Sequence, residues 1–135
     1  MIIGIGNDLA EVERIQASLE NPRTGLRFRD RVFTPGEQAY CERRGAGKYQ
    51  SYAARFAAKE AVMKALGTGW GPEVNWLDIE VMKHRGKRPD IILHGKAKAH
   101  AAALGIQRIH LALTHTATLA EAQVVAEGED MGIGG

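Results

Sequence analysis

The 135-residue sequence has few of the residues that mark disulfide-rich, zinc-binding or nucleic-acid-binding proteins. Cys41 is the single cysteine, so no internal disulfide can form, and the five histidines show no zinc-type spacing and no HExxH pattern. This favours a reducing compartment. The net charge is only +2, from 18 basic and 16 acidic residues, which excludes the strong positive field of a dedicated nucleic-acid binder. Any binding of anions must therefore be local.

Long hydrophobic runs are also missing. The chain begins with Met1 to Gly6, has no basic region there and reaches Asp8 at once. We therefore expect no secretory signal peptide, no membrane span and a cytoplasmic location. The length and the 44% hydrophobic composition are typical of one globular domain. We assign that domain to residues 1–127 and expect a disordered tail over residues 128–135, which has little to bury.

The common phosphate-binding motifs are incomplete. Gly4 and Gly6 have the spacing that starts a dinucleotide fingerprint, but Leu9 stands where its third glycine is needed. Gly67 and Gly69 are not followed by the Lys-Ser or Lys-Thr pair of a P-loop. Neither a Rossmann nor a P-loop site is predicted, which leaves metal-plus-carboxylate chemistry open.

The apolar periodicity predicts an α+β fold in which a small antiparallel sheet packs against a long central helix. Residues 22–36 form a basic loop with about one helical turn, and Thr34 followed by Pro35 indicates a helix N-terminus. We expect strands at residues 2–5, 77–82, 91–93, 108–115 and 119–127, and helices at residues 11–20, 35–43, 48–66 and 95–104.

The helix at residues 48–66 has two faces that can be buried, one aromatic and one rich in alanine. Phe56 belongs to the aromatic face and is predicted to pack in the core. Charged residues fall on the two borders between these faces. Arg55 and Lys59 share one border, and Glu60 and Lys64 share the other.

Asp8 and Glu60 each have two interpretations. Asp8 lies three residues before Glu11 at the start of a periodic run, as in a capping box, or it is a metal ligand. Glu60 precedes Lys64 by four residues, an exposed pairing worth about 0.3–0.5 kcal/mol. It also borders the aromatic face, where an unpaired carboxylate is costly and a metal ion would compensate it. The residue pattern alone leaves both interpretations open.

Three separated motifs occur in order along the chain. Residues 4–9 are GIGNDL, followed by ERI at residues 13–15, and residues 55–61 are RFAAKEA, followed by KALGTG at residues 64–69. Residues 113–116 are LTHT, followed by AQVV at residues 122–125. Together they resemble the holo-acyl-carrier-protein synthase family from Met1 to about Glu127.

The resemblance implies a 4′-phosphopantetheinyl transferase-like fold and an enzyme of fatty acid biosynthesis. Such an enzyme transfers the 4′-phosphopantetheine arm of coenzyme A to a serine of an apo acyl carrier protein and releases adenosine 3′,5′-bisphosphate. It implies that Asp8 and Glu60 are ligands of Mg²⁺, which needs only one or two carboxylates besides phosphate oxygens. Glu60 and Lys64 are then the catalytic residues. The general base stays open between Glu60 and a metal-bound water.

The resemblance also suggests ligands for coenzyme A. Lys64 is placed to reach the pyrophosphate as a point charge, and Arg55 and His115 are candidates for the other phosphates. Gly67 ends the helix and its bare backbone allows close approach of a phosphate. For Lys59 a structural or solvent-facing role and ligand binding stay equally open.

The basic residues of the first third of the chain suggest a protein partner. Arg14, with Arg27 and the neighbouring arginines, forms a local positive surface suited to docking an acidic carrier protein, although a merely solvated face is the alternative. The resemblance further implies a homotrimer with active sites between subunits.

Two other functions stay open on the sequence. A different magnesium-dependent phosphoryl-transfer enzyme or nuclease would share the carboxylates but would not depend on coenzyme A. A non-catalytic RNA- or protein-binding module would use the arginines of residues 23–31, and its binding would survive loss of Asp8 and Glu60.

Overall fold

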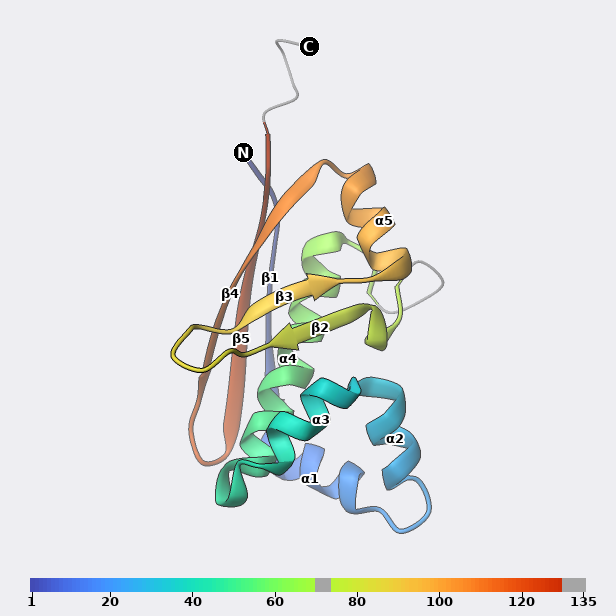
Figure 1. Ribbon diagram of the computed structural model, residues 1–135, viewed down its shortest axis with the longest axis vertical. Coiled ribbons are helices and arrows are strands. Elements are labelled where there is room, and N and C mark those ends of the chain that lie inside the picture. Colours follow the sequence, from blue (N-terminus) through green and yellow to red (C-terminus); the bar gives the residue numbers. More distant parts are fainter. Residues whose placement is uncertain (70–73, 130–135) are drawn as a thin grey trace.

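A three-stranded antiparallel sheet and a long helix form the centre of the molecule (Figure 1). The computed structural model describes residues 1–69 and 74–129. The strand order is β1-β5-β4, so the first strand of the chain pairs with the last. The strands of this sheet are β1 (Ile2–Glu11), β4 (Ile106–His115) and β5 (Leu119–Gly128), and the long helix is α4 (Lys48–Leu66).

The remaining elements surround α4. Figure 1 shows α1 (Val12–Glu20), α2 (Gly25–Val32) and α3 (Pro35–Glu42) gathered around its N-terminal end and α5 (Gly95–Ala103) near its other end. A two-stranded antiparallel hairpin contacts α4 through one strand and β4 through the other. The strands of this hairpin are β2 (Ile79–Met82) and β3 (Asp90–Leu93), and two short 3-10 helices are η1 (Gly45–Gly47) and η2 (Trp76–Asp78).

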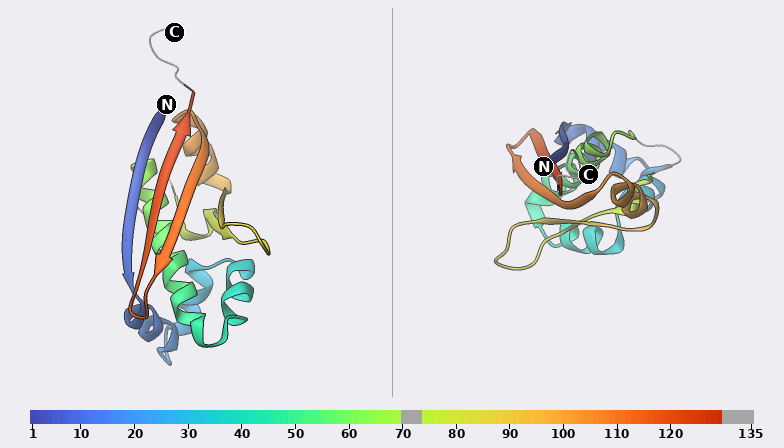
Figure 2. Two further views of the ribbon diagram at one scale, coloured as in Figure 1. Left: turned by 90° about the vertical axis from the view of Figure 1, so that its left-hand side faces the viewer. Right: turned by 90° about the horizontal axis from the view of Figure 1, so that it is seen from above.

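Small side chains let the sheet and α4 pack closely. On β5 every second residue is buried against the helix, and most are alanines, as are many buried residues of α4. Figure 2 shows the three strands side by side with α4 behind them. The opposite sheet face carries exposed apolar side chains, with Ile5 68% and Leu9 63% exposed.

Two glycines of β1 bring the strand backbone onto α4. A Cβ atom added at Gly6 would overlap the carbonyl oxygen of Ala61, and one added at Gly4 would overlap that of Ala65. Two residues along the strand and four along the helix span nearly equal lengths, so each strand step matches about one helical turn. Asp8 comes at the next step, on the same strand face, and therefore lies beside α4.

The structure confirms the α+β class and the order of the predicted elements. The capping box at Thr34 is also confirmed, since its hydroxyl accepts from the Glu37 backbone and the Glu37 carboxylate accepts from the Thr34 backbone. The predicted strand at residues 2–5 is too short, because pairing with β5 continues β1 to Glu11. The predicted loop at residues 22–36 contains the full helix α2.

The predicted placement of Arg55 and Lys59 on a charged border of α4 is wrong. Arg55 is 4% exposed and Lys59 is 0% exposed. The Lys59 ammonium donates to the carbonyl oxygens of Trp76 and Ile79, at 3.0 and 2.7 Å, and lies 2.7 Å from the carboxylate of Glu37. Both charges are fully buried, so Lys59 has the structural role.

The ends of the predicted domain need one adjustment. Gly128 is the last residue of β5 rather than the first of the predicted tail. Residues 130–135 of the predicted tail lie outside the described part, as do residues 70–72 of the helix stop predicted at residues 67–72. Among the described residues no helix is both long and apolar enough to cross a membrane.

Candidate active site

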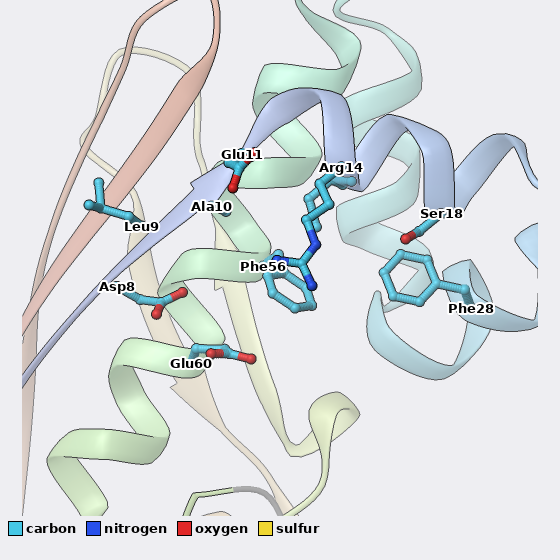
Figure 3. Close-up of a pocket in the computed structure, with 10 residues that line it drawn as sticks. Asp8, Leu9, Ala10, Glu11, Arg14, Ser18, Phe28, Phe56 and Glu60 are labelled. Atoms are coloured by element: carbon cyan, nitrogen blue, oxygen red, sulfur yellow. The ribbon is translucent and has the colours of Figure 1, made fainter.

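Asp8 and Glu60 meet where β1 passes α4. Figure 3 shows the two side chains one above the other, Asp8 from the strand and Glu60 from the helix. Asp8 does not cap α1: the cap residue is Glu11, and it makes no side-chain cap hydrogen bond. The capping-box interpretation of Asp8 is therefore wrong.

Lys64 pairs with Asp8 across the two elements. Its ammonium lies 3.0 Å from the Asp8 carboxylate and 2.9 Å from the carbonyl oxygen of Asn7. The predicted helical ion pair between Glu60 and Lys64 is absent from the described residues. Lys64 is 52% exposed in its side chain, whereas Asp8 is 13% exposed, so the basic group covers the acidic one from the solvent side.

Glu60 has an environment that disfavours its negative charge. Burial raises the pKa of its carboxyl group, and the nearby charge of Asp8 raises it further, while Lys64 partly offsets both. In the described part of the chain the Glu60 carboxylate has no hydrogen bond or ion pair. A cation between Glu60 and Asp8 would relieve this cost.

These two carboxylates fit a hard divalent cation. No group of three or more potential metal-ligating His, Cys, Asp or Glu side chains occurs among the described residues, which does not suit an all-protein cage such as a structural zinc site. Mg²⁺ is commonly held by one or two carboxylates, with water and substrate phosphate supplying the other oxygens. The donor set at Asp8 and Glu60 therefore suits Mg²⁺ bound together with a phosphorylated substrate.

A cavity of about 320 Å³ opens beside the two carboxylates, and we call it the carboxylate cavity. Figure 3 shows Arg14, Phe56 and Phe28 along the side that leads away from Asp8 and Glu60. Its full lining comes from β1, α1, α2 and α4, and comprises Asp8, Leu9, Ala10, Glu11, Arg14, Ile15, Ser18, Phe28, Phe56 and Glu60.

Two further hollows adjoin this cavity through shared residues. The arginine hollow has a volume of about 550 Å³ and is lined by Arg14, Arg27 and Arg31 with no acidic side chain. The apolar groove has a volume of about 560 Å³ and is lined by Phe28, Arg31, Val32, Phe56, Glu60, Val74, Asn75 and Trp76. One end of the molecule thus combines an acidic, a basic and an apolar surface.

The structure does not bring every predicted residue into this region. Arg55 is on another side of α4, with its guanidinium 4.1 Å from the centre of the Tyr40 ring. His115 ends β4 and pairs with Ala120 of β5, which pairs with Ala10, so the whole width of β5 separates His115 from β1. Gly67 ends α4 in the left-handed conformation, with φ 74°, as predicted for a helix stop.

The sequence did not single out Phe28 or Trp76. Phe56 was predicted to be core, yet it is only half buried and lines both the carboxylate cavity and the apolar groove. The rings of Phe56 and Trp76 are stacked, with centroids 5.1 Å apart. Aromatic residues at helical spacing usually pack in the core, and no signal in the sequence distinguishes those that line a cleft.

Comparison with known proteins identifies the family. Residues 4–122 match the family ACPS, the 4′-phosphopantetheinyl transferase superfamily. The holo-[acyl-carrier-protein] synthase of Solibacter usitatus (strain Ellin6076) is 54% identical over 127 residues, covering 94% of this chain and 99% of the relative. The holo-[acyl-carrier-protein] synthase of Koribacter versatilis (strain Ellin345) is 47% identical over 127 residues and also covers 94% of this chain and 99% of the relative.

Solved structures of the same kind are similar in fold. The Bacillus anthracis str. Ames holo-(acyl-carrier-protein) synthase, in complex with CoA (3′,5′-ADP), is 36% identical with a TM-score of 0.78, covering 96% of this chain and 99% of its own. The Neisseria meningitidis synthase is 30% identical with a TM-score of 0.82, covering 94% and 99%. The chain therefore belongs to the 4′-phosphopantetheinyl transferase superfamily and, within it, to the holo-[acyl-carrier-protein] synthases.

Proposed function

We propose that the protein transfers the 4′-phosphopantetheine arm of coenzyme A to a serine of an apo acyl carrier protein, with Mg²⁺, and releases adenosine 3′,5′-bisphosphate. The observation that carries this proposal is the pair of carboxylates, Asp8 and Glu60, that lines the carboxylate cavity, with Lys64 bound to Asp8 and a hollow lined by arginines next to it. The protein would act in the cytoplasm, and the reaction would serve fatty acid biosynthesis.

The chemistry needs few protein groups. Asp8 and Glu60 would hold Mg²⁺, which when bound would offset charge that develops on the pyrophosphate. Lys64 is exposed enough to leave Asp8 and pair with a pyrophosphate oxygen as a point charge. The proton of the attacking serine would be accepted by the Glu60 carboxylate or by a metal-bound water. Phe56 lines one side of the cavity.

The remaining contacts to coenzyme A would involve a second copy of the chain. We propose that Arg55, Gly67 and His115 bind coenzyme A, and that His115 serves a site on a neighbouring copy, since it is far from Asp8 within one chain. The exposed apolar side chains Ile5 and Leu9 on the open sheet face support association, and a homotrimer is the assembly that we propose.

The direct test combines the protein with coenzyme A, MgCl₂ and an apo carrier protein and follows the intact mass of the carrier. We expect a gain of one phosphopantetheine, loss of the gain with a chelator, and recovery when Mg²⁺ is added back. A carrier whose acceptor serine is replaced by alanine is the control and should gain nothing. No gain with the unmodified carrier, or a gain that a chelator leaves unchanged, would refute the proposal.

The arginine hollow is the surface that we propose for the acidic carrier. The charge reversals Arg14→Glu and Arg27→Glu should each raise KM for the carrier roughly ten-fold. Complementary charges speed the encounter of the two proteins and fix the orientation in which the carrier docks. KM for coenzyme A should stay the same in Arg27→Glu, because Arg27 does not line the carboxylate cavity, whereas Arg14 lines both hollows. Steady-state rates at varied carrier concentration measure the effect.

Lys98→Glu provides the matched control for these two variants. Lys98 is exposed on α5, away from the hollow, and the variant makes the same charge change. Equal rises in KM for all three variants would point to a non-specific effect of net charge and would contradict docking at the arginine hollow.

A further inference from the structure

The buried ammonium of Lys59 joins three elements to α4. A lysine ammonium has three N–H donors, and three acceptors surround this one. They are the carboxylate of Glu37 at 2.7 Å and the carbonyl oxygens of Ile79 at 2.7 Å and Trp76 at 3.0 Å. These acceptors belong to α3, β2 and η2, so a single side chain of the long helix holds all three elements.

Both ends of η2 are held in this way. The element is a single turn of three residues, closed by the backbone N–H of Asp78, which donates to the carbonyl oxygen of Asn75 at 3.0 Å. Short 3-10 turns have poor hydrogen-bond geometry, so they depend on contacts from outside for their position. Lys59 donates to the carbonyl of Trp76, the first residue of η2, and to that of Ile79, directly after its last residue.

The position of η2 affects the surface beside Glu60. The ring of Trp76 stacks on that of Phe56, with centroids 5.1 Å apart and an angle of 24° between the planes. Phe56 lies about one helical turn before Glu60, and both residues line the carboxylate cavity. All three residues line the apolar groove. A shift of η2 would therefore change the wall next to the Glu60 carboxylate.

We propose that Lys59 is a positioning residue for the transfer reaction, an inference that rests on the proposed function. By holding η2 on α4, it keeps the Trp76 ring against Phe56 and fixes the wall beside Glu60. Lys59 is fully buried and lines none of the three hollows, so it acts through Trp76 and not by contact with a substrate. Small misplacements of reacting groups slow the chemical step, so the effect belongs to kcat.

Two variants separate positioning from the buried charge pair. In Glu37→Gln the amine of Lys59 remains. Burial lowers the pKa of Lys59 and Glu37 counteracts this, so removal of the carboxylate favours the neutral amine. A neutral amine still has two N–H groups for the carbonyls of Trp76 and Ile79. The double variant Glu37→Gln with Lys59→Met also lacks the charge pair, but it has no donor for these carbonyls.

Steady-state transfer is measured on samples that far-UV circular dichroism shows to be folded. We expect the double variant to lose about ten-fold in kcat, with KM for the carrier within about two-fold of the wild type. Glu37→Gln should keep kcat within about two-fold. Trp76→Leu leaves Lys59 and its acceptors in place and should lose kcat about as much as the double variant. A wild-type kcat in Trp76→Leu or in the folded double variant would overturn the proposal.

Tryptophan fluorescence tests the hold on η2 without any activity. Trp70 is the other tryptophan of the chain, so the variants are made in a Trp70→Phe background. We expect acrylamide to quench Trp76 about two-fold more strongly in the double variant than in Glu37→Gln, because its ring is no longer held against Phe56. Equal quenching in the two variants would contradict the role of Lys59. Absence of transfer by the unmodified protein would instead refute the proposed function, and the quenching comparison would still decide whether Lys59 holds η2.

Discussion

Glu60→Gln is expected to reduce the rate of phosphopantetheine transfer by about 10²–10³-fold. Glutamine keeps the size of the side chain but removes the negative charge that would hold Mg²⁺ with Asp8. The loss should fall on kcat, because the ion acts on charge that develops during the reaction. Initial rates from the mass of the carrier, at saturating coenzyme A and Mg²⁺, measure it.

The same variant should not be less stable. Burial and Asp8 raise the pKa of Glu60 in the folded protein, so the folded state binds its proton more tightly than the unfolded state does. The stability that this group contributes is therefore fully present below the pKa of the unfolded state and is lost as the pH rises through the pKa of the folded state. At neutral pH without metal, Glu60→Gln should melt at the same temperature as the wild type or higher.

Glu20→Gln is the matched control for activity. Glu20 lies at the end of α1, accepts hydrogen bonds from Gln16 and Tyr49, and lines none of the three hollows. Its rate should stay within about two-fold of the wild type, since exposed surface changes are usually small in effect. Undiminished transfer by Glu60→Gln would contradict the metal role of this residue.

Lys59→Met should lower the free energy of unfolding by about 3–5 kcal/mol. The change leaves the carboxylate of Glu37 buried without its cation, although the backbone N–H groups of Thr34 and Val81 still donate to it. Burial lowers the pKa of Lys59 and Glu37 counteracts this, so each charge depends on the other. Urea denaturation followed by circular dichroism measures the loss.

Two comparisons separate the effect of breaking the buried ion pair from the effect of replacing any lysine by methionine. Lys48→Met breaks the pair with Glu42, whose side chains are 32% and 46% exposed, and should cost less than about 1 kcal/mol. Glu37→Gln combined with Lys59→Met removes both buried charges and should be more stable than Lys59→Met alone. If Lys48→Met and Lys59→Met were equally destabilising, the buried pair would not be the cause.

Local signals in the sequence were sufficient for some elements. The capping box of Thr34 and the left-handed Gly67 depend on residues within one or two turns, and both are confirmed. The length of β1 could not be predicted, because Gly6, Asn7 and Asp8 have little strand preference of their own. They are extended because they pair with Val124, Gln123 and Ala122 of β5.

In the candidate site, too, some features follow from local sequence and others depend on contacts made only in the folded chain. Its two carboxylates were found through the family motifs, and helix phase placed Glu60 and Lys64 on one border of α4. The choice of Asp8 as the partner of Lys64 depends on how β1 lies on the helix, which no local pattern specifies. The burial of Lys59 depends in the same way on Glu37 and on the carbonyl groups of η2 and β2, which approach only in the folded chain.

Pairing between the first and the last strand also sets when the site can form. Ile2 to Glu11 find their partners in β5, which is synthesised after every other helix and strand that the structure describes. A nascent chain on the ribosome can build α4 early, but Asp8 has no strand to hold it beside Glu60 until Leu119 to Gly128 have emerged. The two carboxylates should therefore come together only after β5 has left the ribosome, which separates folding of the helices from acquisition of activity.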